Sequence, residues 1–192
     1  MKDLDLKEIP EDNKFLARTK RTLLKNFNIG SGNRIDDAVL LATYLKVIGR
    51  IDESSALLES FVYGVESKSD RRDQWGAVGQ GILLLAAIYR EKGDSNKERE
   101  LVSYIVEDDI MSDRLSRAEY LAEDLSEHHE IIDYYKQESH KYRCRILAQQ
   151  ILTFTYFYEM FPTYQHEVHE SEKLVIEKII ETTSSLLAEE IG

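Results

Sequence analysis

The sequence predicts an all-α protein that folds as a single domain of seven or eight helices. In nearly every segment longer than ten residues, apolar residues recur with the helical period of about 3.6 residues. No segment alternates apolar and polar residues as a half-buried strand does. The 192 residues include 9 glycines and 2 prolines, which is few for a linker-rich chain, and 42% are apolar, which is enough for one core. We therefore expect one domain over residues 1–192.

The first predicted helix runs from about residue 13 to residue 27 and is basic and amphipathic. Its apolar side is formed by Leu16, Leu23, Leu24 and Phe27. Its charged side is formed by Lys14, Arg18, Arg21 and Lys25. The turn residues at 28–33 include two glycines and predict where the helix ends. Such a helix can lie on a membrane surface, but its apolar stripe is narrow and the rest of the chain is acidic, so we interpret it as a packed helix.

Two helical hairpins are predicted next. The first has helices at about 36–48 and 53–63, and the second has helices at about 74–91 and 97–106. Gly49 and Gly93 stand where a glycine would end the first helix of each hairpin. Asp52 and Ser95 stand where the N-caps of the return helices are expected.

The two hairpins form a diverged repeat with an offset of 44 residues. Leu41-Ala42-x-x-Leu45-x-x-x-Gly49 matches Leu85-Ala86-x-x-Tyr89-x-x-x-Gly93. This spacing resembles the first helix of a tetratricopeptide repeat, in which a small residue lets paired helices approach and a large one fills the groove. The resemblance covers residues 36–107 and implies stacked antiparallel hairpins. The chain departs from the family in repeat length, and Ser54 and Glu98 stand where the family has an alanine.

A long helix from about residue 127 to residue 160 and a last helix from about 167 to 190 complete the predicted fold. The apolar side of the long helix is formed by Ile131, Tyr135, Tyr142, Ile146, Ile151, Phe154 and Tyr158. Pro162 ends it. The last helix repeats Val168, Leu174, Ile179, Ile180, Leu186 and Leu187. The sequence leaves open whether this C-terminal helix pairs within the chain or across a homodimer.

Charge is distributed unevenly along the chain. The net charge is −11, which disfavours nucleic acid as the main partner. Residues 107–133 hold ten acids against two arginines, and such a segment steers cationic partners. We predict a protein-binding surface whose charged residues are Glu107, Asp108, Asp109, Asp113, Glu123, Asp124 and Glu127. Tyr104 and Tyr120 are the predicted aromatic anchors. The alternatives are a solvated helix face that only keeps the protein soluble and a store of metal ions.

Two clusters suggest bound groups. Gly76, Gly79 and Gly81 lack the preceding strand and the following Lys-Ser/Thr of a phosphate-binding loop, so we interpret them as sites of close helix packing. His166 and His169 precede an acidic residue, but they lack the spacing of a zinc-protease helix. We therefore predict no metal and no cofactor.

One pair of side chains suggests catalysis. His140 and Cys144 lie one helical turn apart, and the flanking Arg143 and Arg145 would lower the pKa of the thiol. However, two residues on one helix rarely aim at a substrate, and no third group to orient them is evident. We expect no enzymatic activity; the enzyme hypothesis would need a pocket that gathers His128, His129 and His140.

The overall character is similar to that of small acidic immunity proteins of bacteria, which bind and neutralise a toxin. This similarity implies a non-enzymatic inhibitor of a basic protein partner. The single cysteine, the absence of a long apolar run and the mixed charges of the first twelve residues predict a cytoplasmic protein without a membrane segment. The alternative is a tetratricopeptide-like adaptor or chaperone, whose peptide groove would use Thr43, Tyr44, Lys46 and Arg90.

Overall fold

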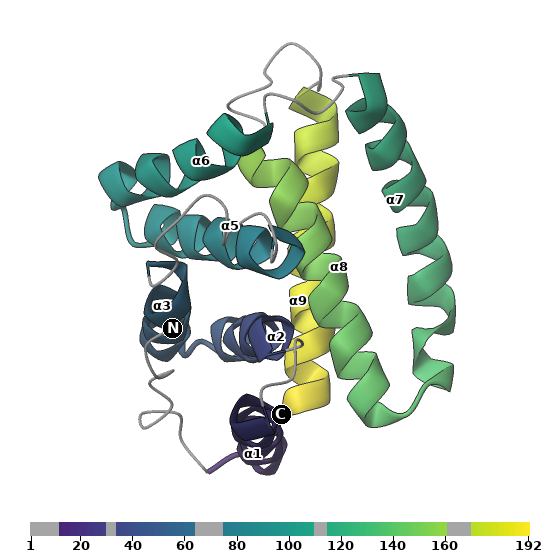
Figure 1. Ribbon diagram of the computed structural model, residues 1–192. Coiled ribbons are helices and arrows are strands. Elements are labelled where there is room, and N and C mark those ends of the chain that lie inside the picture. The colour runs from purple at the N-terminus through teal and green to yellow at the C-terminus, as the bar shows by residue number, and fades with distance from the viewer. Residues whose placement is uncertain (1–11, 30–33, 64–74, 110–114, 161–169) are drawn as a thin grey trace.

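The all-α class is confirmed by the computed structural model, which describes residues 12–29, 34–63, 75–109, 115–160 and 170–192 (Figure 1). Within these ranges there are eight α-helices, one short 3₁₀ helix and no strand. The elements are α1 (Lys14–Ile29), α2 (Arg34–Val47), α3 (Ile51–Val62), α5 (Trp75–Glu91), α6 (Ser95–Asp109), α7 (Leu115–Tyr134), η1 (Tyr135–Gln137), α8 (His140–Met160) and α9 (Glu170–Ile191).

The turns of the two hairpins, α2–α3 and α5–α6, are built as predicted. Gly49 and Gly93 have φ angles of 81° and 75°, which the lack of a Cβ atom permits. In the first turn, the N–H of Gly49 donates to the carbonyl of Lys46, and the next N–H donates to that of Leu45 at 2.9 Å. The second turn repeats both bonds 44 residues later. This double hydrogen bond satisfies carbonyls that the helix end leaves free.

The predicted N-caps are each wrong by one or two residues. Asp52 lies inside the first turn of α3, which begins at Ile51, and its carboxylate accepts a hydrogen bond from Lys92 Nζ at 2.8 Å. Asp94 rather than Ser95 caps α6, because its Oδ1 accepts the backbone N–H of Lys97 at 3.2 Å. Each return helix starts sooner than predicted, because the chain has already reversed its direction at the residue that follows the glycine.

The hairpins stack through close contacts between helices. Ala42, Ala86, Leu45 and Tyr89, which carry the repeat pattern, are all buried. A Cβ atom on Gly81 of α5 would lie 2.9 Å from the ring of Phe61 on α3, so close packing explains this glycine as predicted.

Ser54 and Glu98, which stand where the tetratricopeptide pattern has an alanine, each form a hydrogen bond to the partner helix of their hairpin. The hydroxyl of buried Ser54 donates to the carbonyl of Ala42 at 2.7 Å and so joins α3 to α2. Glu98 accepts a hydrogen bond from Arg90 Nε at 2.8 Å and so joins α6 to α5. A polar residue in each return helix therefore replaces the small alanine contact by a hydrogen bond to its partner helix.

The C-terminal helices α8 and α9 pack along each other and across the hairpins (Figure 1). The last helix therefore pairs within the chain. α8 lies on α2 and α5, and α9 lies on α2, so the main core joins the hairpins to this pair. None of the helices in the described ranges combines the length and the apolar character needed to cross a membrane.

The predicted continuous helix over 127–160 is wrong. α7 ends at Tyr134, η1 follows, and Glu138 is extended with φ −82° and ψ 160° before α8 begins. Residues 136–141 contain no apolar side chain, so a helical turn here would gain no stability from packing against the core. The break resets the helical register, so Tyr135 is buried whereas Tyr142 is 58% exposed.

Two further residues predicted to face the core are exposed. Leu24 of α1 is 40% exposed, because its neighbour Leu23 occupies the buried face and successive residues are turned about 100° around the helix. Leu174 of α9 is 62% exposed, and Ile176, two residues later, is buried instead.

Candidate protein-binding surface

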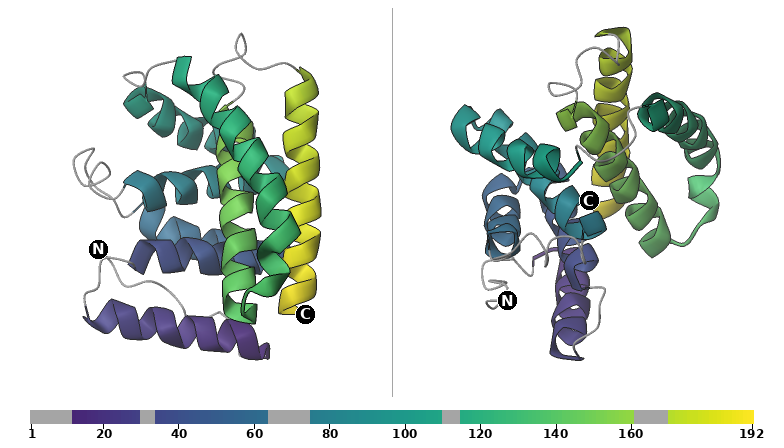
Figure 2. Two further views of the ribbon diagram at one scale, coloured as in Figure 1. Left: turned by 90° about the vertical axis from the view of Figure 1, so that its right-hand side faces the viewer. Right: turned by 45° about the horizontal axis from the view of Figure 1, so that its top comes forward.

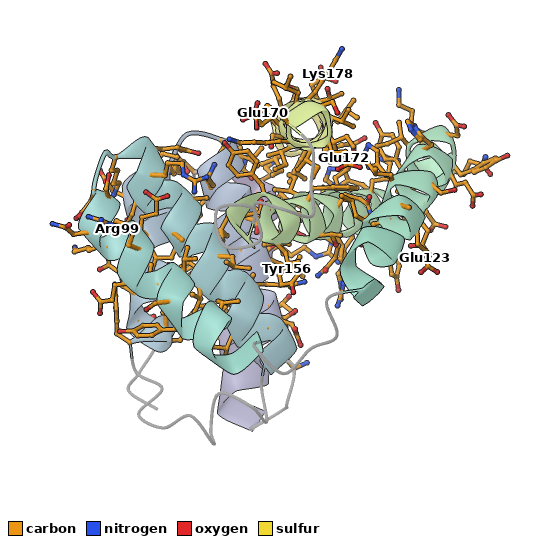
Figure 3. The ribbon with its side chains drawn as sticks, turned by 90° about the horizontal axis from the view of Figure 1, so that it is seen from above. Arg99, Glu123, Tyr156, Glu170, Glu172 and Lys178 are labelled. Carbon is orange, nitrogen blue, oxygen red and sulfur yellow. The ribbon has the colours of Figure 1, made fainter. Side chains whose placement is uncertain are left out.

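The structure brings together some of the residues predicted to form the acidic surface. Glu123, Asp124 and Glu127 lie on α7, while Tyr104 lies on α6 at the other side of α8 (Figures 1 and 3). The Tyr104 hydroxyl donates to Glu100 of its own helix at 2.7 Å. Glu107, Asp108 and Asp109 belong to α6 and Tyr120 to α7, with only their backbone described, and Asp113 is outside the described residues. The predicted surface is therefore divided between two helices.

The outer side of α7 carries a regular row of charges. Glu123, Glu127 and Glu130 follow one another at steps of four and three residues, which places them on one side of a helix, and all three are exposed. Tyr134, four residues further, is 64% exposed. We call these four residues the acidic face. Figure 3 shows Glu123 on the side of α7 turned away from α8.

The charges of the acidic face are not neutralised within the described part of the chain. Residues 121–134 contain no lysine or arginine, and no described cation lies within 4 Å of the three carboxylates. Asp124 lies at the margin of this face, where burial, and then the charges of Glu127 and Glu123, raise the pKa of its carboxyl. A bound cation would relieve this repulsion.

Sequence reasoning missed Glu130 and Tyr134 as members of this surface. The signal that could have found them is their spacing, since residues 123, 127, 130 and 134 fall within a narrow sector of a helical wheel. The density of acids along the chain, unlike their position around the helix, also points to the neighbourhood of Tyr104.

Among the described residues, α7 is attached to the rest of the fold by a small apolar cluster and, near its C-terminal end, by Ile131 and Ile132, which pack against the main core. This cluster is formed by Leu121, Phe154, Ile176 and Ile179, with Leu125, Tyr158 and Ile180 at its margin. His128 extends it, since its ring meets that of Phe154 edge-on at 5.3 Å and its Nδ1 donates to Gln150 Oε1 at 2.9 Å. The acidic face thus lies on a helix that stands at the side of the bundle (Figure 2).

The docking of α7 is expected to weaken in acid. Burial lowers the pKa of His128 below its ordinary value of 6.5, so the folded state binds fewer protons than the unfolded state. The stability from neutral His128 is therefore present above pH 6.5 and is lost as the pH falls below it. Urea unfolding at about pH 7.5 and about pH 5.5 should show a larger loss for the wild type than for His128→Gln.

The neighbouring exposed histidine provides the control for this experiment. His129→Gln changes the same residue type one position away and should keep most of the wild-type dependence on pH, because burial rather than the charge of His129 is the main cause of the lowered pKa of His128. An identical loss of stability in the wild type and in His128→Gln would contradict the assignment.

The His140–Cys144 pair is arranged for structure rather than for nucleophilic chemistry. Cys144 is fully buried, and burial, followed by the charge of Glu190, raises the pKa of its thiol to about 11. The predicted lowering is wrong, because Arg143 opposes this shift but does not outweigh it. His140 Nε2 lies 3.7 Å from the sulfur but donates to the backbone carbonyl of Glu190 at 2.6 Å, so this nitrogen cannot also accept the thiol proton.

His140, together with Arg143 and Asn13, instead holds the C-terminal end of α9. Arg143 Nε donates to the Glu190 carboxylate at 2.8 Å, and Asn13 Nδ2 donates to the carbonyl of Ile191 at 3.1 Å. Asn13 Oδ1 also caps α1 by accepting the N–H of Phe15 at 2.9 Å. Among the described residues, no group of three His, Cys, Asp or Glu side chains could hold a metal ion, and His166 and His169 lie outside that part.

The residues predicted to line a peptide groove are engaged within the fold. Thr43 and Tyr44 are buried, and the Thr43 hydroxyl donates to the carbonyl of Val39 at 2.8 Å. Lys46 pairs with Glu91, and Arg90 pairs with Glu98. α8 and α9 lie across α2, and α8 lies across α5, so the chain itself covers the helices that an adaptor would offer to a peptide.

Comparisons of the chain with protein-family models, with characterised proteins and with solved structures find no match.

Proposed function

We propose that the chain is a non-enzymatic protein-binding protein that captures a basic protein partner through the acidic face of α7. In this proposal it acts as an inhibitor of the immunity-protein kind, and its partner is a cationic toxin or effector. The single observation that carries the proposal is the row of carboxylates at Glu123, Glu127 and Glu130, which no cation of the described residues pairs with and which ends at the exposed ring of Tyr134.

The physics of this face suits rapid capture of a cation-rich surface. The three carboxylates span about 10 Å along the helix, which is about one Debye length at 0.1 M salt, so they act on an approaching partner as one field. Their attraction raises the rate of encounter, and an aromatic side chain that becomes buried on contact slows release. An inhibitor of this kind works by covering the cationic surface that its target uses.

The cytoplasm is the compartment that we propose. Cys144, the single cysteine of the chain, is buried as a free thiol, as is usual for proteins of a reducing compartment. A bacterial inhibitor that acts on its partner before export would meet it there.

A charge-reversal experiment tests the acidic face. Glu127→Lys/Glu130→Lys should reduce capture of a partner from the native lysate at least about tenfold at low salt, because it turns attraction into repulsion. Glu181→Lys/Glu189→Lys is the matched control, since it makes the same change of charge on exposed residues of α9. The control should retain the partner, and about 0.5 M salt should release the partner from the wild type.

The opposite pattern would contradict the proposal. If both variants retain the partner equally and high salt does not release it, then the acidic face does not make the contact. Retention of this kind would favour the adaptor alternative, in which a peptide segment is held mainly by apolar contacts.

A further inference from the structure

The basic residues of α1 form a second regular row of charges. Lys14, Arg18, Arg21 and Lys25 follow one another at steps of four, three and four residues, and all four are exposed. None of them lies within 4 Å of a described carboxylate. We call these residues the basic face.

The apolar side of α1 is already used within the fold. Leu16 and Leu23 are fully buried in the main core, and Phe15 meets Tyr44 edge-on at 5.1 Å. Apart from Leu24, the described apolar side chains of α1 are therefore taken up by the fold, and we expect an occupant of the basic face to be held by charge.

The basic face and the acidic face have the same spacing. Residues 123, 127, 130 and 134 also follow at steps of four, three and four. This spacing reads the same in both directions, so two helices can align side by side whether they run parallel or antiparallel. Each row spans about 16 Å. The alignment would form three pairs between a cation and a carboxylate, and it would place the fourth cation at Tyr134, where it could lie over the ring.

The two faces do not meet within one molecule. α1 packs against α2, while α7 packs against α8 and η1. α1 runs across the end of the bundle, whereas α7 runs along its side, as Figure 2 shows from two directions. The complementary face that α1 could reach must therefore come from another molecule.

We propose that the chain associates with itself by docking the basic face of α1 in one copy onto the acidic face of α7 in a second copy. Every copy carries one face of each kind, so the contact is possible between any two molecules. It is limited by the net charge of −11, through which the copies repel one another over longer distances. The association is therefore concentration-dependent and sensitive to salt.

This contact would regulate the surface used in the proposed function. An α7 covered by α1 of another copy is closed to a foreign basic partner, so the partner must compete with self-association. The inference shares the acidic face with the proposed function, but its test needs no foreign partner. The two proposals can therefore fail separately.

Paired charge reversals test the contact by sedimentation velocity. The first variant, Arg18→Glu/Arg21→Glu, puts two carboxylates at the centre of the basic face and cancels its net charge, and the second, Glu127→Lys/Glu130→Lys, puts two cations at the centre of the acidic face. Each variant alone should lose at least about tenfold in association constant at about 0.02 M salt. An equimolar mixture should recover association, because the two reversed residues of one variant then meet the two oppositely charged reversed residues of the other.

The mixture separates this contact from any general effect of charge. Glu181→Lys/Glu189→Lys should self-associate at least as well as the wild type, and circular dichroism should show that every variant remains helical. A wild type that stays monomeric at low salt would overturn the inference. It would also be overturned if either variant kept its self-association, or if the mixture gave no heteroassociation.

Discussion

Replacing Phe154 with alanine is expected to lower the free energy of unfolding by about 3–5 kcal/mol and to loosen the part of α7 around Leu121 and Leu125 from the rest of the fold. Phe154 is fully buried in the small cluster between α7, α8 and α9. Its ring also supports His128 edge-on. The substitution removes a large apolar side chain at the place where α7 is attached, so the cavity that it leaves opens this contact first.

Hydrogen exchange is the measurement that checks this result. In Phe154→Ala, amides of residues 121–134 should exchange faster by a larger factor than amides of α2 and α5, because α7 opens locally before the fold unfolds. Leu58→Ala is the control, since Leu58 is fully buried in the main core. It should destabilise the protein by about 2–5 kcal/mol without singling out α7. Wild-type protection of α7 in Phe154→Ala would contradict the assigned attachment.

Replacing Gly81 with alanine is expected to destabilise the protein by about 1–2 kcal/mol. The added Cβ would lie 2.9 Å from Phe61 Cε2 and 3.3 Å from Val39 Cγ2. Phe61 is only 1% exposed, so its ring cannot move aside into solvent. Overpacking of this kind costs about 1–3 kcal/mol, and the better helix propensity of alanine offsets up to about 1 kcal/mol of it.

A double-mutant cycle separates the clash from the change in helix propensity. Phe61→Leu removes the ring atoms that the new methyl group would meet, so Gly81→Ala should cost less in that background, as measured by urea unfolding. If Gly81→Ala instead stabilised the otherwise unchanged protein, helix propensity would dominate and the contact between α5 and α3 would be looser than described.

The local parts of the fold could be predicted from the sequence because local chemistry decides them. The turns at Gly49 and Gly93 need a residue that tolerates a positive φ, and the sequence offers a glycine at each place. The break at residues 135–139 was not predictable from periodicity, because the steps between Tyr135, Tyr142 and Ile146 also fit one continuous helix. Tertiary packing decides between the two by burying Tyr135 and leaving Tyr142 exposed.

The candidate site could be predicted only in part for a related reason. Density of acids along the chain points to residues 123–127, which are neighbours on one helix. It also points to Tyr104, which the path of the chain places on α6, away from α7 (Figure 3). Residues that are close in sequence but lie on different helices need not be close in space. A surface formed by two helices can therefore be predicted only when the packing of those helices is known.

Hydrogen exchange of the wild type, with and without its captured partner, would show whether the acidic face of α7 makes the contact. We expect slower exchange on binding for residues 121–134 of α7, with no comparable change along residues 177–191 of α9. Protection confined to α2, α5 or α9, with α7 unchanged in the complex, would contradict the claim that the acidic face binds the partner.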